Sequence, residues 1–525
     1  MTLISTSEVY KFNFNSASYG STLMIAWIIW NILRCIHRLY YHPLRNVPGP
    51  RLAALTFWYE TYYEVVQPAR YTWKIGELHE QYKSPIIRIN PDEIHINDPE
   101  YFDTVYSQRR RVEKPPKSAD SFGPVPGIFG TVDHDLHRMR RAPLNKHFSK
   151  KFVSDLQPWI LSSIEKLCER LEKAKKAGKT VNLKYAYAAV ARDIIDEYCF
   201  SRQMNSVLLE DFNEEYTEAL DAGHDMTPIF IQFRWLGYLL HALPGSLTKM
   251  LDQGFGKLLD EMESVSQQIE TMRTGKCETN KYFDHPTVLR DLLESDMPEA
   301  EKAKDRIKAE AQTLIGAGTS TVAVVLTTTT CHLIANPDKQ QKLFKELLTA
   351  MPNTLTPLPL QDLERLPYLT AVILEGHRLS HVSSHRLPRV FTSDTLTYAS
   401  YTIPAGTTVS MTPLLMHENS SVFPFPHEFR PERWLGDKGT KLKRFLVPFA
   451  KGTRQCIGLN LANAELYMVL GMVFRRFAFE FEGVVKERDW TVSRDTVIGS
   501  MRKDSKGVIV RVKEAGDRLS NGVEV

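Results

Sequence analysis

The sequence of 525 residues lacks several patterns that would assign it to a common class of proteins. No CxxC pair occurs among its six cysteines, which are scattered at Cys35, Cys168, Cys199, Cys277, Cys331 and Cys456. This spacing argues against a disulfide framework and a cysteine-rich zinc site. The net charge is only +4, which argues against a dedicated nucleic-acid-binding protein. Any cysteine chemistry must therefore come from one thiol acting alone.

The sequence also lacks internal repeats, low-complexity linkers after Pro50, and a GxGxxG-type fingerprint for a flavin or nicotinamide cofactor. Apolar residues make up 43% of the chain and charged residues 24%, which is ordinary for a globular protein. Length alone would suggest roughly three to four domains. Because no break in composition follows Pro50, we expect one large domain instead.

An apolar run near the N-terminus, from Tyr19 to Leu33, is close to the roughly 20 residues that a membrane span needs. Basic residues follow this run and are scarce before it, which places the rest of the chain in the cytosol. A cleaved signal peptide fits less well, because the basic residues lie on the wrong side of the run. A buried N-terminal helix is the other alternative. We predict a tail and membrane anchor in residues 1–33, a basic and proline-rich hinge in 34–50, and the main domain in 51–525.

The main domain is predicted to be mainly α, with small β-sheets towards each end. From about Asp135 to Ser380, apolar residues recur at spacings of three and four. Sequence patterns typical of β-strands occur in IIRINPDEIHIN, PRVFTS, LTYASYTIPAGTTVSM and GVIVRV. The uncharged stretch between Glu310 and Asp338 is long enough to cross a bilayer, but it is rich in hydroxyl groups. We therefore predict a long helix through the protein core.

The most specific pattern is FAKGTRQCIG, residues 449–458. Gly452 and Gly458 flank Cys456 and would let the backbone approach a flat ligand closely. A helix is predicted to begin directly after the cysteine, and its N-terminal dipole favours thiolate over thiol. Arg454 could meet a carboxylate of that ligand. A lone cysteine is usually an inert core residue, so the hypothesis depends on this context.

This segment resembles FxxGxRxCxG, the haem-binding signature of the cytochromes P450, and it matches at every fixed position. The resemblance extends from Pro48 to the last strand. It implies the cytochrome P450 fold, in which a single large haem-thiolate domain is tethered by an N-terminal helix. It also implies that Cys456 is the axial ligand of the iron of haem b, that Phe449 packs near the sulfur, and that Arg454 binds a haem propionate.

Other segments resemble further motifs of the same family. Glu375-Gly376-His377-Arg378 matches ExxR, and FRPERW supplies Arg433. The resemblance implies a cluster of Glu375, Arg378 and Arg433 that braces the cysteine loop and takes no part in the chemistry.

Two basic segments resemble the sites through which the family binds the haem propionates. Arg389, in HRLPR, matches the propionate-binding arginine of a strand. The run HRMRR resembles WxxxR, which implies that Arg141 binds a propionate and that His137 stands where many members have tryptophan. We expect Arg138 and Arg140 to lie on a solvated helix face.

The segment Ala317-Gly318-Thr319-Ser320-Thr321 resembles the family's oxygen-side motif, with Ser320 in place of the usual acid. A mid-helix glycine costs about 1 kcal/mol relative to alanine, so Gly318 needs a reason, which is either a flat ligand or close helix packing. The Thr321 hydroxyl is expected to bond back to the Ala317 carbonyl. The resemblance implies that Ala317, Gly318, Ser320 and Thr321 form the catalytic side and that Thr321 helps to deliver protons. Ser320 could pass a proton but could not store one.

The resemblance implies a membrane-bound monooxygenase that inserts one oxygen atom of O2 into a lipophilic small molecule. Electrons would come from NADPH through a separate NADPH–cytochrome P450 reductase, with both proteins on membrane lipid of the endoplasmic reticulum. Residues 42–106 look like fungal secondary-metabolism members such as trichodiene oxygenase, which implies a terpenoid or similar substrate. Two alternatives stay open: a haem-thiolate isomerase or dehydratase that needs no electrons, and a non-catalytic, membrane-anchored haem-binding or scaffold protein.

Overall fold

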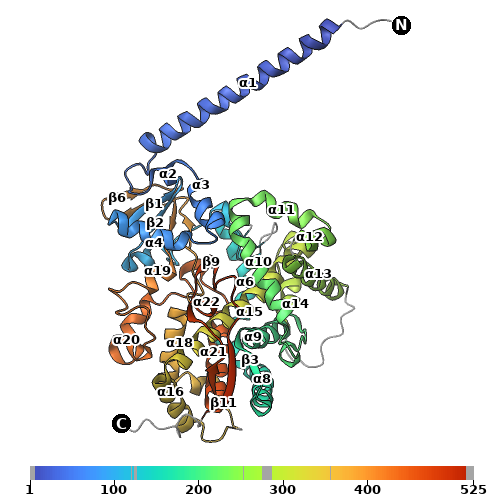
Figure 1. Cartoon of the computed structure of the whole chain (residues 1–525), viewed down its shortest axis with the longest axis vertical. Coiled ribbons are helices and arrows are strands. Elements are labelled where there is room, and N and C mark those ends of the chain that lie inside the picture. The colour runs from blue at the N-terminus through green and yellow to red at the C-terminus, as the bar shows by residue number, and fades with distance from the viewer. Residues whose placement is uncertain are drawn as a thin grey trace.

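Helices dominate the computed structural model, which describes residues 6–119, 121–122, 127–251, 253–274, 287–354 and 356–515 (Figure 1). Cys277 lies outside the described residues. The first helices are α1 (Thr6–Ile36), α2 (Arg51–Leu55), α3 (Trp58–Thr61), α4 (Tyr71–Tyr82) and α5 (Phe102–Val105), with a π-helical turn η2 (Tyr62–Val66) after α3. The later helices are α6 (His134–Asn145), α7 (Lys150–Asp155), α8 (Gln157–Ala177), α9 (Leu183–Phe200), α10 (Glu214–Gln232), α11 (Arg234–Ala242), α12 (Gly245–Leu251), α13 (Gln253–Arg273), α14 (Val288–Glu294), α15 (Lys304–Ala335), α16 (Pro337–Ala350), α17 (Leu360–Leu363), α18 (Pro367–Leu379), α19 (Pro413–His417), α20 (Gly436–Leu442), α21 (Leu459–Arg476) and α22 (Lys486–Asp489).

The strands form small sheets, as predicted for a mainly α fold. One sheet has the order β1 (Ile86–Asn90), β2 (Glu93–Ile96), β7 (Thr408–Ser410) and β4 (Arg389–Val390), in which only the β2–β7 pair is parallel. A second has the order β3 (Thr180–Asn182), β11 (Ile509–Glu514) and β8 (Phe477–Phe481). The remaining pairs are β5 (Leu396–Tyr398) with β6 (Tyr401–Ile403), and β9 (Arg494–Thr496) with β10 (Ile498–Ser500). All four predicted strand regions are confirmed.

Helix α1 projects away from the rest of the molecule (Figure 1). Its apolar stretch Tyr19–Tyr41 is long enough to cross a membrane, and none of its most apolar window is buried. The alternative of a buried N-terminal helix is therefore wrong. By length and composition the stretch is a candidate anchor or signal sequence.

Helix α15 is the second stretch long enough to cross a membrane, but 67% of its most apolar window is buried inside the protein. It packs along α9 and α18 in the largest hydrophobic cluster. Its hydroxyl-rich part is buried as well, and the Thr330 hydroxyl lies 3.0 Å from that of Tyr187. The predicted core helix is confirmed.

Candidate functional site

Cys456 lies in the turn between the 3-10 helix η9 (Gly452–Arg454) and α21, and its N–H donates to the Phe449 carbonyl at 3.0 Å. Gly452 has φ +78°, and a Cβ there would lie 2.6 Å from the Tyr106 carbonyl oxygen. This glycine therefore serves the packing of the turn against a neighbouring loop, and our expectation that it admits a flat ligand is wrong. At Gly458 a Cβ would meet only the Cys456 Sγ, at 3.9 Å.

The Cys456 side chain is accessible, although many protein atoms surround the thiol. Burial raises the pKa of the thiol, although the Gly458 N–H and Arg141 act in the opposite direction. The helix N-terminus therefore does not by itself produce the expected thiolate. A bound metal ion would, because coordination deprotonates a thiol. Within the described ranges no cluster of three or more His, Cys, Asp or Glu could hold a metal ion, so Cys456 would act as a single ligand.

The predicted propionate-binding residues converge beside this cysteine. Arg141 Nη1 donates to the Gln455 carbonyl at 2.6 Å, and Arg454 Nη1 donates to the Thr131 carbonyl at 2.6 Å. Arg389 is 4% exposed, and its Nη1 donates to the Pro388 carbonyl at 2.9 Å. The guanidinium groups thus bind backbone carbonyls, which carry no compensating charge.

The positive charges of this cluster lower one another's pKa values. Burial, reinforced by Arg389, lowers the pKa of Arg454 to about 9. Burial also lowers the pKa of His137 to about 2, with Arg454 and Arg141 acting in the same direction, so this imidazole is neutral at physiological pH.

Lys114 is a member of this cluster that the sequence analysis missed. Its Nζ donates to the Phe129 carbonyl at 2.5 Å and lies 3.6 Å from the centre of the Phe129 ring. Burial lowers its pKa well below the usual value, and Arg389 and Arg454 lower it further. Its sequence context, EKPPKS, carries no signal that sets it apart from a solvated loop lysine.

We tested whether these residues fit the cofactor that the resemblance implies. Asp133 and Glu113 offset only part of the effect of burial and neighbouring cations on Arg454, and the Arg454 Nε is buried without a hydrogen-bond partner. An anion beside this guanidinium would therefore be favourable. A ligand with carboxylates at its edge and a metal ion at its centre would satisfy both the cations and the Cys456 thiol. The residues fit haem.

Helix α15 carries Ala317 and Thr321 in its middle part. The Thr321 hydroxyl donates to the Ala317 carbonyl at 2.8 Å, which confirms the predicted bond. Ala317 is exposed although it lies in the middle of a core helix, so this part of α15 faces a space inside the protein. Ser320 is half-buried.

Gly318 does not belong to this face. A Cβ at Gly318 would lie 2.9 Å from the Ile195 Cγ1 on α9. Of the two explanations for this glycine, close helix packing is therefore correct, and its assignment to the catalytic side is wrong.

The structure brings Glu375, Arg378 and Arg433 together. Both carboxylate oxygens of Glu375 accept from Arg378, at 3.0 and 2.7 Å, and Arg433 Nε donates to the same carboxylate at 3.1 Å. Trp434 Nε1 adds a fourth bond at 2.8 Å, which the motifs did not indicate. Glu375 and Arg378 are fully buried, and their helix α18 contacts the cysteine loop through the rings of His377 and Phe449, whose centres are 5.0 Å apart.

Arg140 differs from our expectation of a solvated side chain, whereas Arg138 is exposed as expected. Arg140 is 8% exposed, and its Nε lies 2.6 Å from Glu301 Oε2. The pattern could not reveal this, because Glu301 belongs to a segment far away in the sequence.

Fold and site together show a mainly helical protein in which an accessible cysteine lies beside a cluster of buried cations. The chain belongs to the cytochrome P450 family, whose model matches residues 73–503. It is 40% identical over 491 residues to a cytochrome P450 monooxygenase of Ascocoryne sarcoides, covering 91% of this chain and 95% of that protein. It is 38% identical to an N-acetyltryptophan 6-hydroxylase of Emericella nidulans, covering 94% and 97%, and 37% identical to a tryptophan 6-hydroxylase of Fusarium equiseti, covering 94% and 96%. The chain is an enzyme of this monooxygenase family, which implies haem with thiolate ligation.

Proposed function

We propose that this enzyme uses haem b, held by Cys456, to oxidise a lipophilic small molecule of fungal secondary metabolism. The observation that carries the proposal is the accessible Cys456 thiol beside a cluster of buried cations. When bound there, haem would supply the activation of O2, and a thiolate ligand favours cleavage of the O–O bond.

The residues of the chain have separate tasks in this proposal. Lys114, Arg141, Arg389 and Arg454 neutralise the propionates, with His137 as a neutral donor beside them. Thr321 would help to deliver protons at the oxygen side, and its hydroxyl donates to the Ala317 carbonyl. Ser320 can pass a proton through its hydroxyl. Glu375, Arg378 and Arg433 hold the cysteine loop in place.

The proposed substrate class rests on the named activities of the relatives and on the resemblance of residues 42–106 to fungal secondary-metabolism enzymes. Two relatives are named as hydroxylases of tryptophan or N-acetyltryptophan, which favours an aromatic, indole-type molecule as a second candidate beside a terpenoid.

Electrons would come from NADPH through a separate cytochrome P450 reductase. The apolar stretch of α1 would anchor the enzyme in the membrane of the endoplasmic reticulum, with the catalytic domain in the cytosol. Such an arrangement would bring the enzyme, the reductase and an apolar substrate to one lipid surface.

The deciding experiment is coexpression with a reductase, followed by product analysis with indole-type and terpenoid candidates. We expect products that depend on NADPH and O2. Turnover without NADPH would support the isomerase or dehydratase alternative, and haem binding without any turnover would support the scaffold alternative.

Cys456→Ala should abolish the thiolate-type Soret band of the reduced, CO-treated protein, because no other described cysteine is accessible in a comparable setting. A retained band would show that Cys456 is not the ligand.

A further inference from the structure

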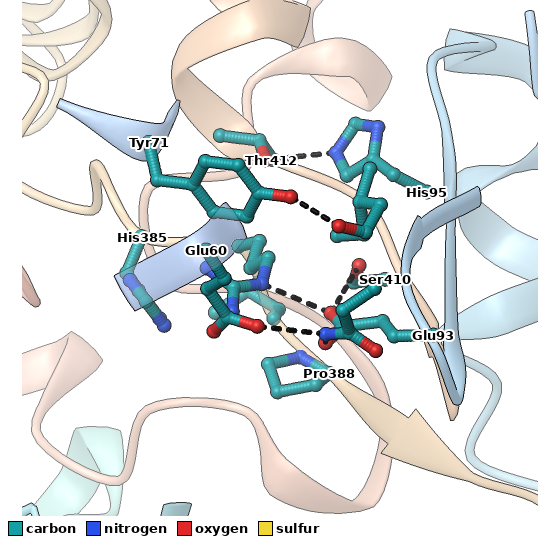
Figure 2. A network of polar contacts seen from close by, with 12 residues as sticks. Glu60, Tyr71, Glu93, His95, His385, Pro388, Ser410 and Thr412 are labelled. Carbon is teal, nitrogen blue, oxygen red and sulfur yellow. Dashed lines mark hydrogen bonds and ion pairs between the residues drawn. The ribbon is translucent and has the colours of Figure 1, made fainter. Parts of the chain in front are cut away.

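A network of buried charges lies outside the catalytic site, around the carboxylates of Glu60 and Glu93 (Figure 2). The two carboxylates share the amide nitrogen of Asn90, at 2.8 and 2.9 Å. Lys117 Nζ lies 3.1 Å from both Glu60 oxygens and 3.2 Å from Glu93 Oε2. Arg386 Nε lies 2.9 Å from Glu93 Oε1, and its Nη2 contacts Glu60. These five residues are called the carboxylate network below.

The charges within the carboxylate network balance one another. Burial acts to raise the pKa of Glu60 and of Glu93, but the two cations lower each value to about 2. Two ionised carboxylates therefore face Lys117 and Arg386. Because removal of one partner from a buried ion pair is strongly unfavourable, the network resists displacement of the segments that carry its cations.

Each cation of the carboxylate network lies three residues from a member of the cation cluster beside the cysteine loop. Lys117, in the 3-10 turn η4 (Pro116–Ser118), follows Lys114, and Arg386 precedes Arg389. Lys114 and Arg389 donate to backbone carbonyls, which carry no compensating charge. The network therefore holds the same two segments of the chain that bring Lys114 and Arg389 to the cofactor site.

The two segments are joined to each other where these cations lie. Glu113 and Val390, the direct neighbours of Lys114 and Arg389, exchange two backbone hydrogen bonds of 2.9 Å. Burial lowers the pKa of Lys114, and the positive charge of Arg389 lowers it further, so the two cations lie close together. A shift of either segment would therefore change the position of both.

Strand β7 connects the carboxylate network with Arg389 by a second route. It pairs with β4, where Val409 lies opposite Arg389, and with β2, which begins at Glu93. The next residue of β7, Ser410, donates its hydroxyl to Glu93 Oε1 at 2.8 Å. Glu93 thus fixes the sheet on which Arg389 stands.

We propose that the carboxylate network positions Lys114 and Arg389 for the anionic edge of the cofactor. The inference rests on the proposed function, in which this cofactor is haem. Two buried cations repel each other until an anion binds, so the folded chain has to hold them in place. Lys117 acts through Lys114, and Arg386 acts through Arg389, which makes the members of the network positioning residues.

The test is a double-mutant cycle on the rate at which the holoprotein transfers haem to apomyoglobin. Lys117→Met removes the cation of the network that has the most contact with water, because its side chain is 24% exposed. Lys117→Arg is the conservative variant that keeps the charge. Lys184→Met is the matched control, because the Lys184 side chain is 29% exposed and pairs with Asp221 at 2.7 Å.

We expect Lys117→Met to raise the rate of haem transfer several-fold and at most about tenfold, because it loosens a charge-assisted contact of Lys114. In the Lys114→Met background the same change should have no further effect, since Lys117 acts through Lys114. Lys117→Arg should restore most of the wild-type rate, and Lys184→Met should leave it unchanged. The reduction potential of the haem should fall in Lys117→Met, because a displaced cation stabilises the reduced form less.

Glu60→Gln tests both arms of the network together, because Glu60 contacts Lys117 as well as Arg386. The rate of haem transfer should rise in this variant too. It should rise further in the Lys114→Met background, since the arm that ends at Arg389 is still intact there.

A rate of haem transfer in Lys117→Met equal to that of the wild type would overturn the inference. Additive effects of Lys117→Met and Lys114→Met would also overturn it, because Lys117 would then act on the protein as a whole. In both cases the thiolate-type Soret band of the CO complex would remain, and the proposed function would stand. Absence of that band from the wild-type protein would instead overturn both.

Discussion

At the scale of single residues, the environment decides which of many similar side chains belong to the site. Arg140 and Arg141 are neighbours in one basic run, yet Arg140 binds Glu301 and Arg141 joins the cysteine loop. Lys114 and Lys117 are three residues apart, and only Lys117 has carboxylate partners among the described residues. A lysine or arginine with a carboxylate partner supports the fold, whereas a buried one without such a partner is available to a ligand.

Lys114→Met should therefore have opposite effects on the protein with and without cofactor. Without haem, it removes a buried cation from beside Arg389 and Arg454, so the melting temperature should rise. With haem, it removes a charge-assisted contact, so the rate of haem transfer to apomyoglobin should rise about tenfold. Lys179→Met, at an exposed lysine, is the control. A change of the same sign in both measurements would show that Lys114 has no role in cofactor binding.

Thr321→Ala should lower the yield of product per NADPH and raise the release of hydrogen peroxide. The reason is that a positioned proton donor contributes about 10²- to 10⁴-fold. Thr319→Ala is the matched control, because Thr319 is 1% exposed and lies away from the accessible face of α15. Ser320→Asp, which restores the family's acid, should preserve or improve the yield. Equal yields in the wild type and Thr321→Ala would mean that protons arrive by another route.

At the scale of elements, short helices carry charges into the core at positions that their own sequence does not reveal. In the stretch formed by α3 and η2, Glu64 lies beside Arg386, with Glu60, Asp495 and His385 as the other charged or titratable neighbours. Burial raises its pKa to about 7, although Arg386 acts in the opposite direction. The folded protein therefore holds a proton here that the unfolded chain releases at a lower pH.

This shift predicts a pH dependence of stability. Because the pKa of Glu64 is raised in the folded state, its stabilising effect is complete below about pH 4.5 and is lost as the pH rises through about 7. Between pH 6 and pH 8 the loss should amount to about 1.4 kcal/mol. The free energy of unfolding, measured by thermal unfolding at each pH, should decline less for Glu64→Gln than for the wild type over this interval. The control Glu80→Gln, at an exposed position, should lose as much free energy of unfolding with rising pH as the wild type does. The same pH dependence in Glu64→Gln as in the wild type would contradict the raised pKa of Glu64.

At the scale of the whole molecule, α3 and α11 lie at the end of the domain from which α1 leaves (Figure 1). On α11, Trp235 is 65%, Tyr238 47% and Leu239 48% exposed. Trp58 is 67% exposed and belongs to the same end. Aromatic side chains of this kind favour the interface between water and lipid. These side chains are therefore a second candidate membrane contact besides α1.

Removal of residues 1–33 should leave haem bound and should turn tight membrane association into weak, reversible binding. The measurement is flotation with phospholipid vesicles after a salt wash. Trp235→Ser in the truncated protein should reduce the remaining binding several-fold, because it removes an apolar group from the interface. Leu435→Ser is a control at an exposed apolar position in the loop between η7 (Pro431–Trp434) and α20. Tight binding after truncation, unaffected by Trp235→Ser, would show that membrane association depends on another surface.

The sequence by itself determined those features that depend on neighbours along the chain. The helix that begins after Cys456, the bond between Thr321 and Ala317, the core helix α15 and the strand positions could all be predicted, because spacing and periodicity are local properties. Only the tertiary structure decided which residues meet across long separations. It assigned Gly318 to the packing of α15 against α9, Gly452 to the packing of a turn, Arg140 to Glu301, and Lys114 to the cation cluster. Burial and unpaired charge arise from elements brought together by folding, and a motif carries no information about them.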